Sequence, residues 1–130
     1  MAITALYAGL LGLIYFALSW MVIRGRRQHG ISILDGDNKD FARTIRGHAN
    51  FAEYVPIVLI LLAIGELSES SAILIHAVGL MLLIGRLAHA WAFLYGPNKI
   101  ARQAGMILTF SALIIGSINC LLIGLPTLTG

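Results

Sequence analysis

The stretch RTIRGHANFAEYVP carries polar and charged side chains directly before the apolar run IVLILLAIG. Within it, Arg46, Asn50 and Glu53 are spaced i, i+4 and i+7, which places all three on one face of a helix. Farther along the chain, Arg86 and His89 share a helix face through their i, i+3 spacing. A glutamate can pair with an arginine, and further guanidinium groups can hold carboxylates or other anions. The residue types therefore indicate an ion pair, an anion-binding site or both.

The composition decides in which solvent these side chains lie. Hydrophobic residues make up 58% of the 130-residue chain and charged residues only 12%, with a mean hydropathy of +0.87. Such a chain is too apolar for an ordinary water-soluble domain. A hydrocarbon core about 30 Å thick needs roughly 20 helical residues to cross it. The sequence supplies four segments of that length, which we expect to be helices spanning the membrane at residues 2–23, 41–67, 72–95 and 104–125.

The short connections between these segments predict the fold, an all-α membrane protein built as an antiparallel bundle of four transmembrane helices. We expect a single domain over residues 1–130, because no linker or repeat interrupts the pattern. The first segment precedes its basic residues, RGRR, so we expect it to remain as a helix rather than to be cleaved as a signal peptide. Asp40 is a candidate N-cap of the second helix, and Gly9 with Gly12 should permit close helix contact.

Basic residues in the connections predict the orientation of the bundle. Lys and Arg in short loops stay on the cytoplasmic side of a membrane. The first and third connections are basic, whereas the second, ELSESS, carries only acidic charge, so both termini are expected on the periplasmic side. The periplasmic half should hold almost no polar side chains, and His76 there is interpreted as a packing or interface residue. The same asymmetry accounts for the net charge of +3, and nucleic acid is not expected as a partner.

Arg46, Glu53 and Arg86 are expected at membrane depth or just beside it, because their segments are long enough to cross only if they include these residues. On insertion scales a charge at the bilayer centre costs about 2.5–3.5 kcal/mol, so the three should face protein or a wet cavity rather than lipid. Glu53 and Arg86 lie at comparable depth, and we expect them to pair. In the simplest interpretation this pair and Asn50 only hold neighbouring helices together.

Further basic groups lie at the cytoplasmic ends of the other helices. Arg24 ends the first segment and Arg102 precedes the last. Together with Arg46 and Arg86 they carry more positive charge than Glu53 can balance. We therefore expect the arginines to converge in one recess that binds a small anion. A metal is not expected, because the histidines lack metal-ligand spacing and the chain has one cysteine.

The segments RGHANFAEYVP and GRLAHAWAF, with the arginine that leads into the last helix, resemble the MAPEG family, the membrane-associated proteins in eicosanoid and glutathione metabolism. The resemblance is to the small bacterial branch of the family and covers nearly the whole chain in helix count, length and motif order. It implies a homotrimer in the bacterial inner membrane. It also implies that glutathione binds as a co-substrate between neighbouring subunits, near the cytoplasmic side.

The resemblance assigns roles to individual residues. Arg102 matches the arginine that the family uses to stabilise the glutathione thiolate, so it is the expected catalytic residue. Glutathione carries two carboxylates, an ammonium group and a thiol, so arginines would face the carboxylates and Glu53 the ammonium group. The implied glutathione contacts are Arg24, Arg46, His48, Asn50, Glu53, Tyr54, Arg86 and His89.

The implied activity is that of a glutathione transferase or peroxidase, which would detoxify hydrophobic electrophiles or lipid peroxides that arrive through the bilayer. Leukotriene or prostaglandin chemistry is disfavoured, because the members that synthesise eicosanoids place tyrosines where this chain has His89 and Phe93. The alternative is a non-catalytic membrane protein that binds glutathione or another small anion, or a subunit of a carrier. A carrier would place polar groups along a path through both leaflets, whereas the sequence places them in one.

Overall fold

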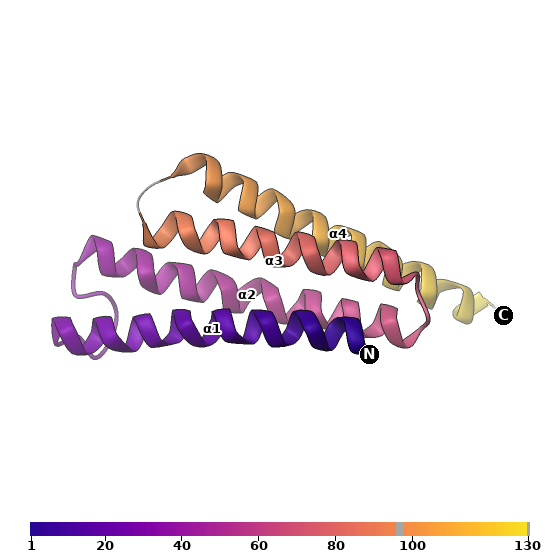
Figure 1. The fold of residues 1–130 in the computed structure, drawn as a ribbon, viewed down its shortest axis with the longest axis horizontal. Helices are drawn as coiled ribbons and strands as arrows, with labels where there is room; N and C mark the ends of the chain where they lie inside the picture. Colours follow the sequence, from indigo (N-terminus) through magenta and orange to yellow (C-terminus); the bar gives the residue numbers. More distant parts are fainter. Residues whose placement is uncertain (96–97, 130) are drawn as a thin grey trace.

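The computed structural model describes residues 1–95 and 98–129, with side chains as far as Pro126. Its helices are α1 (Ala2–His29), α2 (Lys39–Leu67), α3 (Ala72–Leu94) and α4 (Lys99–Thr129). Each runs antiparallel to the one before it, so both termini lie at the end that carries the α2–α3 connection (Figure 1). All four are long and apolar enough to cross a membrane. The predicted all-α bundle of four transmembrane helices is confirmed.

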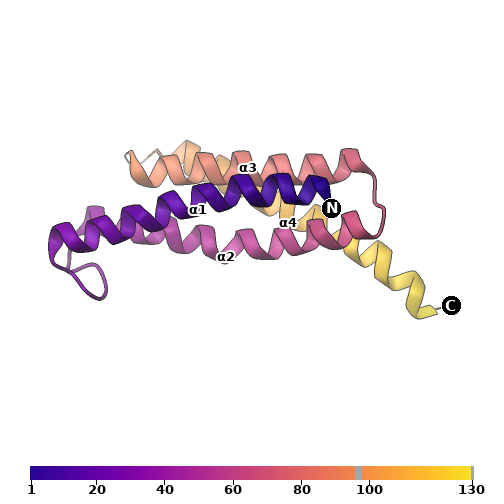
Figure 2. The ribbon, with the colours of Figure 1, turned by 60° about the horizontal axis from the view of Figure 1, so that its bottom comes forward.

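The helices α1 and α4 extend farther than their hydropathy predicts. α1 continues past Ile23 through the basic residues to His29, and Gly30 ends it in a left-handed conformation with φ 64°. α4 begins at Lys99, earlier than predicted, so Arg102 lies inside the helix. Hydropathy marks the apolar layer, whereas a helix can continue beyond that layer while its arginines extend into water. In Figures 1 and 2 the C-terminal end of α4 runs past the other helices.

The N-terminus of α2 is capped by Asn38. Its Oδ1 accepts hydrogen bonds from the backbone N–H groups of Asp40 (3.1 Å) and Phe41 (3.0 Å). The prediction of Asp40 as the N-cap is therefore wrong, because α2 begins earlier than its hydropathy indicates. Asp40 lies in the first turn instead, where a carboxylate interacts favourably with the helix dipole.

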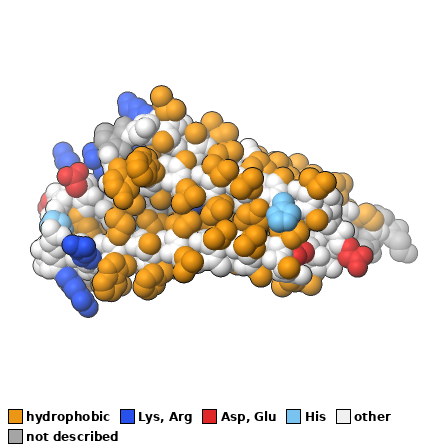
Figure 3. All heavy atoms as spheres, viewed as in Figure 1, with side chains coloured by type: hydrophobic (Ala, Val, Ile, Leu, Met, Phe, Trp, Pro, Cys, Tyr) orange, Lys and Arg blue, Asp and Glu red, His pale blue; other side chains and the backbone are white. Residues whose placement is uncertain are grey.

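Apolar side chains from all four helices form one core. Leu11, Phe51, Leu82 and Ala112, one from each helix, are at most 1% exposed. Large apolar side chains also cover much of the outer surface, and in Figure 3 they spread over the middle of the molecule. An apolar exterior around an apolar core is typical of a bundle that faces lipid.

Two glycines bring α3 and α4 into backbone contact. A Cβ atom on Gly105 would lie only 2.6 Å from the carbonyl oxygen of Gly85, so no larger residue fits between the two helices there. By contrast, a Cβ atom on Gly9 or Gly12 would meet nothing within 4 Å. The close helix contact predicted at Gly9 and Gly12 is therefore not made inside a single chain.

The two ends of the bundle differ in charge. We call the end with the α1–α2 connection and the start of α4 the basic end, because most of the Lys and Arg side chains gather there in Figure 3. The end with the N-terminus and the α2–α3 connection is called the opposite end. Which end faces the cytoplasm stays a prediction.

The opposite end is more polar than predicted. There the carboxylate of Glu66 accepts hydrogen bonds from the backbone N–H groups of Ile3 (2.9 Å) and Thr4 (2.7 Å), at the start of α1. The buried Tyr7 donates its hydroxyl hydrogen to the carbonyl oxygen of His76, and the same hydroxyl lies 3.2 Å from Nδ1 of that histidine. The expectation that this half holds almost no polar side chains is wrong. These groups bond to one another, which lowers the cost of placing them in an apolar layer.

Candidate functional site

Three adjoining hollows lie at the basic end. The outer hollow, of about 510 Å³, lies between α1, α2 and α3 and is lined by Arg24, Arg43 and Phe93 among others. The middle hollow, of about 120 Å³, shares Arg43 and Phe93 with the outer one and adds Arg102 from α4. The inner hollow, of about 490 Å³, shares Arg102 with the middle one. Neighbouring hollows share lining residues, so the three lie next to one another at the basic end.

The inner hollow brings together polar side chains from three helices. Asn50 comes from α2, His89 from α3 and Arg102 from α4. The same wall includes Gln103 and Phe110, neither of which was predicted as a site residue. The sequence prediction thus named Asn50, His89 and Arg102 of this hollow, and it missed Gln103 and the apolar residues beside them.

Arg86 lies behind the inner hollow, not on its surface. Its side chain is 0% exposed and its guanidinium carbon lies 5.6 Å from the centre of the Phe51 ring. Nη2 donates a hydrogen bond to Oδ1 of Asn50 (3.0 Å) and lies 3.3 Å from Nδ1 of His89. Nε and Nη1 are buried without a hydrogen-bond partner among the described residues. Arg86 therefore supports two residues of the hollow and does not line any of the three hollows itself.

The expected ion pair between Glu53 and Arg86 is wrong. Glu53 pairs instead with Arg46, with 3.4 Å between Oε1 and Nη1, and both side chains are exposed, at 46% and 62%. At about 3.6 residues per turn, Asn50 points roughly 40° to one side of Arg46 and Glu53 roughly 20° to the other. Asn50 therefore turns toward Arg86 while Glu53 turns outward, although all three share one broad face of α2.

The arginines do not share one recess inside a single chain. Arg24 lines the outer hollow, and Arg102 lies where the middle and inner hollows meet. Arg46 lines a separate hollow of about 440 Å³, together with Asp35 of the α1–α2 connection. The predicted convergence of the arginines is therefore found only in part within one chain.

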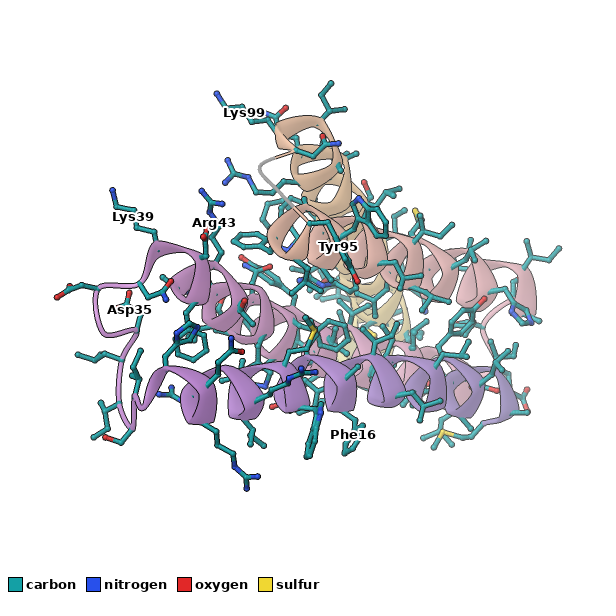
Figure 4. The ribbon with its side chains drawn as sticks, turned by 60° about the vertical axis from the view of Figure 1, so that its left-hand side comes forward. Phe16, Asp35, Lys39, Arg43, Tyr95 and Lys99 are labelled. Carbon is teal, nitrogen blue, oxygen red and sulfur yellow. The ribbon has the colours of Figure 1, made fainter. Side chains whose placement is uncertain are left out.

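Arg43 joins the outer and middle hollows and was missed as a site residue. In Figure 4 it extends from α2 at the same end as Lys99 at the start of α4. Its guanidinium lies 3.3 Å from the carboxylate of Asp40, and both groups remain exposed to solvent. Arg43 and Asn50 are spaced i, i+7, which puts them on the same side of α2. That spacing is the signal in the sequence that could have identified it.

His48 and Tyr54 lie on different sides of α2. His48 turns toward α1, where its Nε2 lies 3.0 Å from Oγ of Ser19 and its ring stacks on Tyr15 at 5.0 Å between centroids. Tyr54 packs edge-on against Phe110, which lines the inner hollow, at 5.5 Å between centroids. Within one chain Tyr54 thus neighbours the inner hollow and His48 does not.

The chemistry that this end of the bundle offers is anion binding. Among residues 1–95 and 98–126, no three His, Cys, Asp or Glu side chains are grouped in a way that could hold a metal ion. The hollows instead present guanidinium groups beside aromatic and aliphatic walls. Guanidinium groups bind carboxylates and other anions through charge-assisted hydrogen bonds, which strengthen where water is partly excluded.

Comparison with known proteins gives one family. The model of the MAPEG family matches residues 4–122, which include part of each of the four helices and every residue discussed above for the three hollows. The chain is 34% identical over 113 residues to the inner membrane protein YecN of Escherichia coli strain K12, covering 87% of this chain and 86% of that protein. YecN of Escherichia coli O6:H1, strain CFT073, matches with the same identity and coverage.

Proposed function

The chain belongs to the MAPEG family, and from this premise we propose that it is a membrane-bound, glutathione-dependent transferase or peroxidase. Its four spanning helices make it a multi-pass membrane protein of the glutathione and eicosanoid family. Because YecN is named as an inner membrane protein, we place this chain in the bacterial inner membrane as well, with its basic end toward the cytoplasm.

The inner hollow is the observation that carries this proposal. It is an open hollow of about 490 Å³ that places Arg102 beside Asn50 and His89 at the edge of the apolar surface. A thiol with an unperturbed pKa of about 8.5 is mostly protonated at neutral pH, and a nearby guanidinium favours the reactive thiolate. Arg102 is the catalytic residue in this proposal and acts through its charge. Met106, Ile107 and Phe110 form an apolar wall along which a hydrophobic second substrate can approach the thiolate from the bilayer.

The remaining parts of glutathione would extend toward the other hollows. The carboxylates would bind Arg24 and Arg43, which line the outer hollow. The ammonium group needs a carboxylate, and the proposed contact is Glu53. Glu53 points outward within its own chain, so it would meet glutathione that lies against a neighbouring subunit.

We propose a homotrimer because Glu53 points away from its own chain and would reach glutathione only at a neighbouring subunit. Arg46 and Glu53 are exposed side chains on a helix that is long and apolar enough to span the membrane. Charged groups at membrane depth face protein or water rather than lipid, so a neighbouring subunit would cover them. The unoccupied space next to Gly9 and Gly12 is also available to a packed neighbour. In this arrangement Arg46 and Glu53 of one chain would complete the glutathione site of the next.

The proposal is tested on protein purified in detergent. Calorimetry measures glutathione binding, and two further assays measure conjugation of a chlorinated nitrobenzene and reduction of a lipid hydroperoxide. Arg102→Leu should lower turnover in either assay by about 10²-fold, since it removes the charge that stabilises the thiolate. Arg27→Leu is the matched control, because Arg27 is an exposed arginine of α1 that lines none of the three hollows.

The outcomes separate the two candidate functions. Binding with turnover supports the enzyme. Binding without turnover supports a non-catalytic anion-binding protein or a carrier subunit, a candidate that also fits YecN, whose name gives a location and no reaction. Absence of glutathione binding overturns the glutathione-dependent enzyme and limits the second candidate to a protein or carrier subunit for another small anion.

A further inference from the structure

We propose that Arg86 turns Asn50 and His89 into hydrogen-bond donors toward the inner hollow. By occupying the acceptor atoms of these two residues, it leaves their N–H groups beside Arg102 to face the ligand, which favours a thiolate or carboxylate over neutral and cationic groups. Gln103 is the other polar side chain of the hollow, and its amide can still accept. This inference rests on the proposed function in one respect, namely that the anion bound there is the thiolate of glutathione.

The first step concerns what Arg86 can bond to. A guanidinium group has five N–H donors and no acceptor. Nη2 of Arg86 lies 3.0 Å from Oδ1 of Asn50 and 3.3 Å from Nδ1 of His89, so both of these atoms must accept. The contact therefore fixes the orientation of the Asn50 amide. It also fixes the tautomer of His89, whose neutral ring must carry its proton on Nε2.

The second step concerns what remains for a ligand. Both Asn50 and His89 line the inner hollow. Asn50 Nδ2 and His89 Nε2 have no hydrogen bond to another described residue, and neither is among the buried atoms without a partner, so both are accessible. Together with the guanidinium of Arg102, they present N–H groups from three helices to the same space. Converging donors of this kind stabilise an anion, and these three side chains offer no acceptor to a cation or an ammonium group.

The third step concerns why an arginine stands at this position. Arg86 is completely buried, and two of its nitrogen atoms have no hydrogen-bond partner. No described carboxylate oxygen lies within 4.0 Å of its guanidinium nitrogen atoms, so it forms no ion pair there. Burying a cation against neutral partners is unfavourable, and an apolar side chain of similar size would generally cost less. Stability alone therefore does not account for Arg86, whereas control of the donors in the hollow does.

The tautomer of His89 is a direct test that needs no ligand. Nitrogen NMR of protein labelled with ¹⁵N-histidine distinguishes the two tautomers, and His89→Gln identifies the signals of His89 by their loss. In the wild type we expect the proton on Nε2. Arg86→Lys keeps a side chain that only donates and should preserve this tautomer, whereas Arg86→Gln can also accept and should allow a mixture. A proton on Nδ1 in the wild type, or an unchanged single tautomer in Arg86→Gln, overturns the inference.

The preference of the protein for one ligand over another is a second measurement. This preference would not change if Arg86 had only a structural role. Glutathione and S-methylglutathione differ in the thiol, and only glutathione can form a thiolate. The wild type and Arg86→Lys should prefer glutathione, and Arg86→Gln should lose about tenfold of that preference. Equal preference in all three variants would contradict the inference. If no variant binds glutathione, the proposed function fails, while the tautomer measurement still decides the role of Arg86. Should Arg86→Gln fail to fold, the wild-type tautomer decides alone.

Discussion

The two ends of the bundle use polar side chains in opposite ways. At the opposite end polar groups bond to one another, as when Asn119 donates to Oγ of Ser70 (3.0 Å) and that hydroxyl donates back to Oδ1 of Asn119 (3.2 Å). The exception there is Oγ1 of the buried Thr4, which has no partner among the described residues. At the basic end Asn50, His89 and Arg102 line the inner hollow with side-chain N–H groups that bond to no other described residue. The difference indicates that polar groups join helices at one end, whereas at the other they are held ready for a ligand.

The largest effect on stability should come from a glycine next to the inner hollow. A Cβ atom on Gly105 would lie 2.6 Å from the backbone oxygen of Gly85 and 2.8 Å from the backbone nitrogen of His89. Because backbone cannot move aside, Gly105→Ala should lower the free energy of unfolding by about 1–3 kcal/mol and weaken glutathione binding. Denaturation in detergent and calorimetry measure the two effects.

Gly65→Ala is the matched change at the opposite end. A Cβ atom there would meet the ends of two side chains, Asn119 at 2.7 Å and Ile75 at 2.9 Å, which can rotate away. Gly65→Ala should lower the free energy of unfolding by less than Gly105→Ala does, and glutathione binding should stay unchanged. Equal losses for the two variants would contradict the difference between the ends.

Asn50→Asp should separate stability from binding. The new carboxylate gives the buried Arg86 an ionic partner, so the unfolding temperature should stay the same or rise. The inner hollow, however, gains a negative charge and loses a donor, which should weaken glutathione binding by about tenfold or more. Asn119→Asp at the opposite end is the control, with unchanged binding and lower stability. Tighter glutathione binding by Asn50→Asp would refute the assignment of the inner hollow as an anion site.

Tyr7→Phe should affect stability alone. It removes the hydroxyl that bonds to His76 and should lower the free energy of unfolding by about 1 kcal/mol. Glutathione binding should be unchanged, because the bond lies at the opposite end. Tyr15→Phe is the control, since the exposed Tyr15 packs through its ring. A loss of binding in Tyr7→Phe would show that the two ends are coupled.

The smallest effect on stability is expected for Glu53→Leu. Its partner Arg46 is exposed, and exposed ion pairs contribute about 0–1 kcal/mol, so the unfolding temperature should change little. Glutathione binding should weaken, because the proposed contact to the ammonium group is lost. Asp40→Leu removes the other exposed pair on α2 and serves as a control for stability. A large loss of stability in Glu53→Leu would show that Glu53 does pair with Arg86.

The number and order of the helices could be predicted, because an apolar layer imposes a length on each segment. The helix ends could not, since α1 satisfies its hydrogen bonds beyond the apolar layer as far as His29. Hydropathy reports where the chain leaves lipid, and it does not report where helical hydrogen bonding stops.

Some residues that line the candidate site could be predicted, but the partners of these residues could not. Periodicity placed Asn50 and Glu53 on one face of α2, yet the rotation of that face against α3 decides which of them meets Arg86. That rotation depends on contacts between the two helices, such as the one where a Cβ atom on Gly47 of α2 would lie 3.2 Å from Cβ of Phe93 on α3. A single sequence gives the spacing within a helix and not the angle between helices.

The bonds from the start of α1 to Glu66 also bear on how the chain is made. They join the first helical turn to a carboxylate that follows Thr4 by 62 residues in the sequence. During translation, the first N–H groups of α1 therefore have no access to their acceptor, Glu66, until α2 has been almost completely synthesised. The α1–α2 hairpin, rather than α1 by itself, is the smallest nascent unit in which these backbone groups find their partner.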